Sequence, residues 1–178
     1  MTKKRVLNVG CGNDTYGTDF VDKYPSRKDV IKCDIDCEGL PFDGETFDEV
    51  YSRCVLEHLK NPNVALKEMV RVLKKGGKLR LIADNAGFWG FHTPFSKTHY
   101  GGYEKTTQYG EQDRHYSLFT PWHLENHLKD VGLEDVRIKY VDMEEMLPRL
   151  SVRFISRFLR LVGLDRIAYH RIMAEAQK

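Results

Sequence analysis

The chain has 178 residues, which is the size of one domain built around one hydrophobic core. Apolar residues make up 41% of it, charged residues 30%, and the formal net charge is +2. This balance does not suggest a protein that coats nucleic acid. No apolar run approaches membrane-spanning length, and the stretch after the basic N-terminus is too short for a signal peptide. We therefore expect a soluble, cytoplasmic protein with a single domain, 1–178.

Short strand-forming runs dominate the first half of the chain. The apolar run before Gly10 is typical of a buried parallel strand that leads into a glycine turn. The expected strands of this half are Arg5–Val9, Asp19–Asp22, Val30–Asp34, Phe47–Ser52 and Lys78–Asp84.

The clearest predicted helix is Asn61–Lys75. Asn61 suits the N-cap and Pro62 the first helical position. One apolar face follows the spacing i, i+3, i+4, i+7 and consists of Leu66, Met69, Val70 and Leu73. The pair Gly76-Gly77 suits a helix stop. A strand on either side of this helix predicts a βαβ unit and hence a parallel sheet.

The second half begins with an irregular segment rich in Gly, His, Tyr and Phe. We divide the domain into a cofactor-binding half (1–84), a substrate or lid segment (85–120) and a C-terminal half (121–178). The elements expected after the lid are a helix at Pro121–Asp130 capped by Thr120, a strand at Glu134–Val141, and helices at Leu150–Val162 and Asp165–Ala176. Whether a seventh strand completes the sheet stays open.

The four cysteines fall in the first third of the chain and match no paired C-x-x-C zinc pattern. They are Cys11, Cys33, Cys37 and Cys54. We expect free thiols in a reducing compartment and favour this over a Cys33–Cys37 disulfide.

A ligand site is predicted at the carboxyl ends of the first strands. Gly10-Cys11-Gly12 lets backbone amides approach a ligand without a Cβ clash. Asp22 and Asp34 each end a short strand at the same edge of the sheet. One such acid can accept both ribose hydroxyls, and a second can accept an adenine amino group. The pattern therefore favours a nucleotide-like cofactor.

With these motifs in order, the sequence resembles the class I methyltransferases that use S-adenosylmethionine. The segments that carry the resemblance are Leu7–Asn13, Gly17–Asp22, Leu40–Asp48, Val55–Leu59 and Arg71–Gly77. The resemblance implies an α/β, Rossmann-like fold with a mostly parallel sheet and helices on both faces. It also implies methyl transfer without a metal, because the methyl group on the cationic sulfur is already activated.

The resemblance further implies a set of cofactor-binding residues. They are Asn8, Gly10, Cys11, Gly12, Asn13, Asp22, Asp34, Ile35, Ser52 and Arg53. In this assignment the glycine turn lines the methionine part and Asp22 holds the ribose hydroxyls. Asp34, with Ile35 beside it, takes the adenine edge, and Ser52 and Arg53 lie under the sulfonium and its amino group.

Two features depart from the family pattern. The family commonly has an acid where Asn8 stands, and too few residues separate Gly12 from Asp19 for a crossover helix. This resembles a shortened branch that often reads Leu-Asn-Leu-Gly-Cys-Gly. A second alignment makes Val30–Asp34 the second strand and gives its acid the ribose role. We prefer the first, because Asp34 then precedes Leu40 at the family's usual interval.

The expected function is methyl transfer to a small-molecule or glycan/lipid-type acceptor. An O- or N-acceptor needs a base, and the candidates are His115, His99 and His58. One alternative is an inactive regulatory module that still binds the cofactor. Another is a nicotinamide-dependent oxidoreductase, which is disfavoured because the third glycine of Gly-x-Gly-x-x-Gly is missing.

Two groups of side chains in the second half each allow two interpretations. The aromatic residues either wall a substrate pocket or form the core of a small subdomain; they are Phe88, Trp89, Phe91, Phe95, Tyr100, Tyr103 and Tyr109. The helix at Leu150–Val162 carries an apolar face (Leu150, Phe154, Phe158, Val162) and a basic one (Arg149, Arg153, Arg157, Arg160). We expect the apolar face to pack on the sheet. The alternative is weak contact with an anionic surface.

Overall fold

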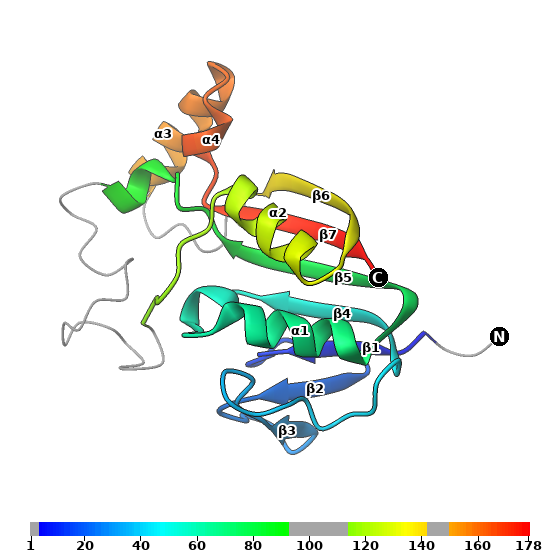
Figure 1. Cartoon of the computed structure of the whole chain (residues 1–178). Coiled ribbons are helices and arrows are strands. Elements are labelled where there is room, and N and C mark those ends of the chain that lie inside the picture. The colour runs from blue at the N-terminus through cyan, green and yellow to red at the C-terminus, as the bar shows by residue number, and fades with distance from the viewer. Residues whose placement is uncertain (1–3, 93–113, 142–149) are drawn as a thin grey trace.

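The structure, a computed structural model, describes residues 4–92, 114–141 and 150–178, with side chains from residue 152 in the last range. One seven-stranded sheet has the order β3-β2-β1-β4-β5-β7-β6 (Figure 1). The strands are β1 (Val6–Val9), β2 (Asp19–Asp22), β3 (Val30–Lys32), β4 (Phe47–Arg53), β5 (Leu73–Asp84), β6 (Glu134–Val141) and β7 (Arg171–Gln177). The five strands β1 to β5 run parallel to one another, and β7 is antiparallel to both of its neighbours, β5 and β6. The predicted mostly parallel α/β sheet is confirmed.

The helices are α1 (Pro62–Val72), α2 (Pro121–Asp130), α3 (Leu150–Leu161) and α4 (Asp165–Ala168), and two single 3₁₀ turns are η1 (Leu56–His58) and η2 (Trp89–His92). As predicted, the Thr120 side chain caps α2 by accepting a hydrogen bond from the backbone amide of His123. Asn61 stands at the N-cap of α1, but its side chain makes no capping bond. None of the described helices is both long and apolar enough to cross a bilayer.

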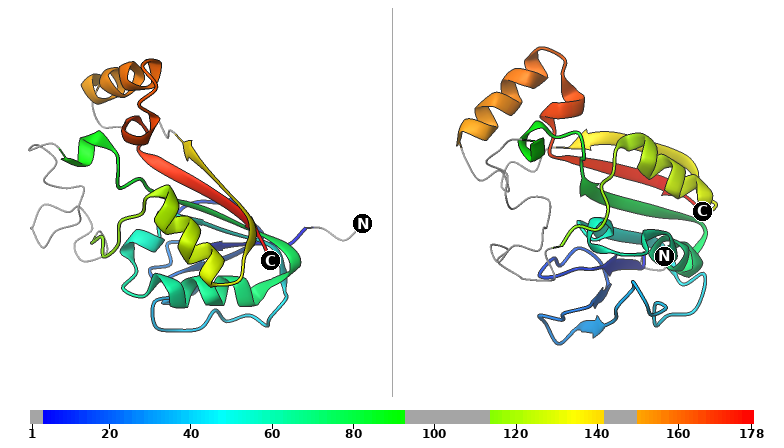
Figure 2. Two further views of the ribbon diagram at one scale, coloured as in Figure 1. Left: turned by 45° about the horizontal axis from the view of Figure 1, so that its top comes forward. Right: turned by 60° about the vertical axis from the view of Figure 1, so that its left-hand side comes forward.

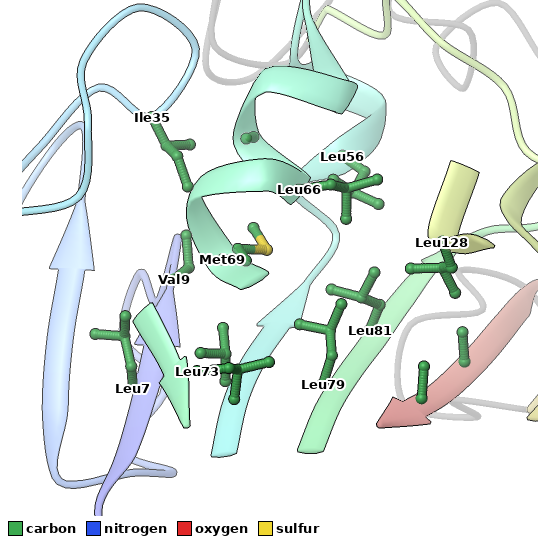
Figure 3. Packing of buried hydrophobic residues seen from close by; sticks show 14 of the residues in the cluster. Leu7, Val9, Ile35, Leu56, Leu66, Met69, Leu73, Leu79, Leu81 and Leu128 are labelled. Atoms are coloured by element: carbon green, nitrogen blue, oxygen red, sulfur yellow. The ribbon is translucent and has the colours of Figure 1, made fainter. Parts of the chain in front are cut away.

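α1 and α2 pack on the same face of the sheet and enclose the main core with it (Figures 1 and 2). Leu66 and Met69 of α1 and Leu128 of α2 are fully buried there. They lie against alternate residues of the central strands, among them Leu7 and Leu79 (Figure 3). Each such side chain contributes roughly 1.5–3 kcal/mol to folding by leaving water.

The connections on the other side of the sheet are short. Residues 10–18 join β1 to β2, and residues 23–29 join β2 to β3, both without a helix. Thr18 closes the first connection, because its hydroxyl accepts a bond from the Val6 amide and donates one to the Val6 carbonyl. The shortened first crossover is therefore confirmed. Because the strand beside β1 is Asp19–Asp22, the preferred alignment is confirmed for the strand order.

The face of the sheet opposite α1 and α2 carries an ionic network. Glu49 of β4 is buried there and accepts hydrogen bonds from Lys4 Nζ (2.6 Å) and from the Tyr16 hydroxyl (2.8 Å). Arg80 of β5 pairs with Glu49 (3.8 Å) and with Glu175 of β7 (3.1 Å). Helices were expected on both faces. In the described part of the chain, Tyr16 from the shortened connection covers Glu49 instead, because that connection is too short to form a helix.

Two element boundaries differ from the predictions. α1 ends at Val72 rather than Lys75, because Leu73 enters the sheet opposite Phe47 and is fully buried. The predicted helix Asp165–Ala176 is wrong. Only Asp165–Ala168 is helical, and Arg171–Gln177 is β7, the strand that completes the sheet. Its residues alternate, with Ile172, Ala174 and Ala176 facing the core.

α3 and α4 lie beyond the carboxyl end of β5, apart from the rest of the sheet (Figures 1 and 2). The expected packing of α3 on the sheet is wrong, since Phe154 and Phe158 are 75% and 57% exposed. Phe88 and Phe91 form a separate small core, which Trp89 and Val152 of α3 join. For these residues the subdomain interpretation is confirmed; the other aromatic candidates, Phe95, Tyr100, Tyr103 and Tyr109, lie outside the described residues.

Candidate functional site at the carboxyl edge of the sheet

The glycine turn after β1 lies at the carboxyl edge of the parallel strands. Gly10 and Gly12 both have positive φ, +66° and +51°, a conformation that costs other residues roughly 1 kcal/mol or more. A Cβ on Gly10 would stand 2.3 Å from Val55 Cγ2, so the turn packs directly against the residues that precede η1. A Cβ on Gly12 would meet no atom within 4 Å. The turn therefore presents open backbone at Gly12.

Asp22, at the end of β2, holds this turn in place. Its Oδ2 accepts a hydrogen bond from the Gly12 amide (2.8 Å), and its Oδ1 accepts one from the Tyr24 amide (2.7 Å). Each carboxylate oxygen can accept more than one hydrogen bond. Asp22 thus supports the turn, and its carboxylate oxygens can still accept further hydrogen bonds at the rim of the turn.

The other residues of the turn have distinct environments. Cys11 is buried, and burial, reinforced by the negative charge of Asp22, raises the pKa of its thiol to about 11. Asn13 is exposed. The four cysteines are free thiols, as expected.

Asn8 does not reach the open side of the turn. Its side chain is buried, and its Nδ2 donates a hydrogen bond to the Tyr16 carbonyl (2.9 Å). An aspartate has no proton to donate to that carbonyl unless it is protonated. The amide at this position is therefore explained by the shortened connection, which it ties to β1.

Asp34 follows β3 and forms an ion pair with Lys23 (2.7 Å). Burial opposes ionisation, but the hydrogen bond from Lys23 and the amide of Asp36 outweigh it and lower the pKa of Asp34. Ile35 is buried in the main core beside Val9 rather than at the rim (Figure 3).

The end of β4 forms the other wall of the turn. The Ser52 hydroxyl is buried and donates to the Val9 carbonyl (2.9 Å), which ties β4 to β1. Arg53 is partly exposed and pairs with Asp14 (3.6 Å), a residue that follows the glycine turn. Asp14, which the sequence analysis did not single out, thus fixes the turn against β4.

Two of the three candidate histidines meet near this edge. The rings of His58 in η1 and His115 are 4.7 Å apart and nearly perpendicular. His58 Nδ1 lies 3.1 Å from the Arg114 carbonyl, and the amides of Tyr116 and Ser117 donate to the Glu57 carbonyl. These contacts join the end of the lid segment to η1. His99 lies outside the described residues.

A buried polar cluster lies beneath this contact. Single ligand atoms of Cys54, Glu57 and Asp84 lie within 4.8 Å of one another. Arg171, at the start of β7, places its Nε 3.0 Å from Asp84 Oδ1. Burial, with the charge of Asp84 adding to it, raises the pKa of Glu57 to about 8.

This cluster is poorly suited to a metal ion. Burial also raises the pKa of the Cys54 thiol, which opposes the thiolate that a metal needs. Arg171 already supplies a cation to Asp84. Asp84 ends β5, and Glu57 lies in η1, the turn that follows the neighbouring strand β4. That placement was the sequence signal for the cluster, but the burial of the pair was not evident from the sequence.

A cavity of about 290 Å³ lies away from this edge. It is lined by residues at the amino end of β5 and on β6 and β7, including Lys78, Arg137 and Glu175. The glycine turn contributes nothing to its lining, so this cavity is not part of the site.

The sheet order, the antiparallel β7 and the glycine turn after β1 define the class I methyltransferase fold. Residues 21–81 match the family described as "Methyltransferase domain". A solved S-adenosylmethionine-dependent methyltransferase from Thermotoga maritima has the same fold, with a TM-score of 0.65 and 19% identity over 100% of this chain and 84% of that one. The chain thus has the class I methyltransferase fold, and its residues 21–81 match the sequence pattern of that family.

Curated relatives match shorter stretches. A sterol 4-C-methyltransferase of Caenorhabditis elegans is 44% identical over 43 residues, which are 24% of this chain and 13% of that protein. A ubiquinone/menaquinone biosynthesis C-methyltransferase of Xylella fastidiosa is 38% identical over 61 residues, 34% of this chain and 23% of that protein. The matches therefore span less than a quarter of either relative.

Proposed function

We propose that the protein transfers a methyl group from S-adenosylmethionine to a small-molecule or glycan/lipid-type acceptor. The observation that carries this proposal is the glycine turn, open at Gly12 and held by the Asp22 carboxylate. The open backbone gives a ligand room to approach, and the carboxylate at the rim suits the vicinal hydroxyls of a ribose. These residues therefore fit the cofactor.

In this proposal each remaining residue has a limited task. Gly10, Gly12 and Asn13 bind the methionine part, and Asp22 holds the ribose. Asp34 can accept from the adenine amino group only while its Lys23 ion pair leaves one oxygen available. The bound cofactor supplies an activated methyl group, so the protein has to align the acceptor and exclude water.

The remaining predicted residues act around this ligand. Arg53 and Ser52 fix the end of β4 beneath it. His58 and His115 are the proposed proton acceptors for an O- or N-acceptor, since imidazole titrates near neutral pH. Two curated relatives, the sterol 4-C-methyltransferase and the ubiquinone/menaquinone biosynthesis C-methyltransferase, support a lipid-type acceptor.

A pair of glycine variants tests cofactor binding. Gly12 and Gly132 both have positive φ, and a Cβ on either meets no atom within 4 Å. Gly12→Ala and Gly132→Ala therefore carry a similar backbone cost, of about 1 kcal/mol, but only the first places a methyl group at the site. Calorimetry with S-adenosylmethionine, S-adenosylhomocysteine and NAD should show at least a roughly tenfold weaker cofactor affinity for Gly12→Ala only.

Three outcomes separate the alternatives. Binding of NAD without S-adenosylmethionine contradicts the proposal. Equal cofactor affinity of the two alanine variants removes the glycine turn from the site. Cofactor binding with no methyl transfer to any acceptor in a screen of sterols, quinones, amines and glycans favours the regulatory module.

A further inference from the structure

α3 has three distinct faces, and one of them attaches it to the domain. Ser156 is wholly buried, and its Oγ accepts a hydrogen bond from Trp89 Nε1 (3.0 Å). Val152, one turn earlier on the same face, packs on the small core of Phe88 and Phe91. These contacts leave one face of the helix pointing away from the domain, whereas Arg153 and Arg160 are only partly exposed.

The second face is apolar and exposed. Phe154, Phe158 and Leu161, at i, i+4 and i+7, are 75%, 57% and 85% exposed. Val162 continues this stripe at i+8 and is 53% exposed. No described residue covers these side chains to any large extent. A contiguous apolar stripe of this kind marks an interaction surface rather than ordinary scatter of exposed apolar residues.

The third face is basic and borders the apolar one. Arg153, Arg157 and Arg160 follow at i, i+4 and i+7, one position before each apolar residue. Arg160 also stacks on the Tyr169 ring at 4.8 Å. α3 contains no acidic residue, so the helix carries charge of one sign. An apolar stripe flanked by cations is the pattern of a helix that lies in a membrane interface.

We propose that α3 docks the protein on an anionic phospholipid bilayer, with Phe154, Phe158 and Leu161 in the headgroup–acyl boundary and the three arginines near lipid phosphates. The helix lies beyond the carboxyl end of β5, the edge of the sheet at which the glycine turn also lies (Figure 1). Docking therefore keeps the candidate site at the bilayer side of the domain. The proposal concerns attachment alone and does not rest on the proposed methyl transfer.

The charge pattern decides between a bilayer and the other occupants. In an antiparallel two-fold contact between two copies through this surface, the arginine face of one α3 would border that of the other, and like charges would repel. Nucleic acid would satisfy the arginines but leave the aromatic and leucine side chains in water. An anionic bilayer satisfies both faces of the helix.

Vesicle flotation with the full chain, without cofactor, tests this proposal. Vesicles of phosphatidylcholine are compared with vesicles that also contain roughly 30% phosphatidylglycerol. The wild type should float with the anionic vesicles and much less with the neutral ones. Arg153→Gln/Arg157→Gln/Arg160→Gln should lower the partition coefficient by roughly 100-fold, because each cation contributes about a factor of five near such a surface.

Two further variants define the surface. Phe154→Ser/Phe158→Ser/Leu161→Ser removes exposed apolar groups and should abolish flotation while the far-UV circular dichroism stays that of the wild type. The matched control Lys32→Gln/Lys67→Gln/Lys75→Gln removes the same charge from exposed lysines elsewhere and should float nearly as the wild type does.

Several results overturn the proposal. They are a wild type that stays unbound, a control that loses as much binding as the arginine variant, and a serine variant that floats normally. A wild type that sediments as a dimer without floating, and becomes monomeric in the serine variant, assigns the surface to self-association instead.

Discussion

Glu57 gives the sharpest test of the buried cluster, through the pH dependence of stability. The side chain is 1% exposed, and burial, with the charge of Asp84 second, raises its pKa from 4.5 to about 8. Between these values the unfolded chain ionises Glu57 while the folded protein keeps the proton. The unfolded state then binds fewer protons, so the free energy of unfolding falls as the pH rises through this window.

Glu57→Gln has nearly the same shape and no ionisation, so it lacks this dependence. At 1.36 kcal/mol per pKa unit, the wild type should lose about 3 kcal/mol relative to the variant between pH 5 and pH 8. Urea unfolding followed by tryptophan fluorescence, at each pH unit of this range, measures the difference. The variant should therefore gain on the wild type as the pH rises.

The exposed Glu134 provides the control, because Glu134→Gln should keep a constant difference from the wild type over the same range. A Glu57→Gln difference that is also constant would refute the reasoning. It would mean that the folded protein holds Glu57 ionised, with Arg171 or a bound cation outweighing burial.

Three other substitutions test the supports of the site. Gly10→Ala brings a Cβ to 2.3 Å from Val55 Cγ2 at φ +66°, and should cost about 3 kcal/mol or more in urea unfolding; a loss below about 1 kcal/mol would show that Val55 yields. Asn8→Asp removes the hydrogen bond to the Tyr16 carbonyl, and should cost about 2 kcal/mol at pH 7 and less as acid protonates the new carboxyl; stability equal to wild type at pH 7 contradicts the role of the amide. In Glu49, burial opposes ionisation, but the hydrogen bonds from Lys4 and the Tyr16 hydroxyl outweigh it and lower the pKa of the carboxyl. Glu49→Gln should therefore lower the free energy of unfolding at pH 7, and this loss relative to the wild type should shrink as the pH falls below about 4.5. A loss that grows in acid would contradict a lowered pKa.

Periodicity and turn chemistry predicted most of the fold because their causes are local. β1 runs straight into Gly10, α1 begins at Pro62 and α2 begins after Thr120, as their residues indicated. The failure at β7 has an equally physical cause. The helix propensity of this segment is high, because it contains Met173, Ala174 and Glu175. Backbone pairing with β5 on one side and β6 on the other nevertheless makes it a strand. The alternation at Ile172, Ala174 and Ala176 was the period-2 signal for it.

The site was predictable to a similar extent and for similar reasons. Residues at the carboxyl ends of parallel strands lie at one edge of the sheet, whichever way their side chains point. The sequence therefore placed Gly12, Asp22 and Arg53 correctly at that edge. Side-chain direction was not predictable in the same way. Asn8 points to the shortened connection, where its amide donates a hydrogen bond to the Tyr16 carbonyl, and Ile35 packs against apolar side chains of the main core.

The shortened connections also explain the polar face of the sheet. A crossover helix would bury the alternate residues of β1, β4 and β5 beneath it, and those positions would then be apolar. Residues 10–18 and 23–29 form no helix, so this face must be stable near water. Glu49, Arg80 and Glu175 meet that condition with paired charges, and Tyr16 covers the most buried of them. Asn8 belongs to the same arrangement, because its amide holds the connection that carries Tyr16. The amide at Asn8 and the short connection thus act together, and an acid at position 8 without a crossover helix should weaken the fold.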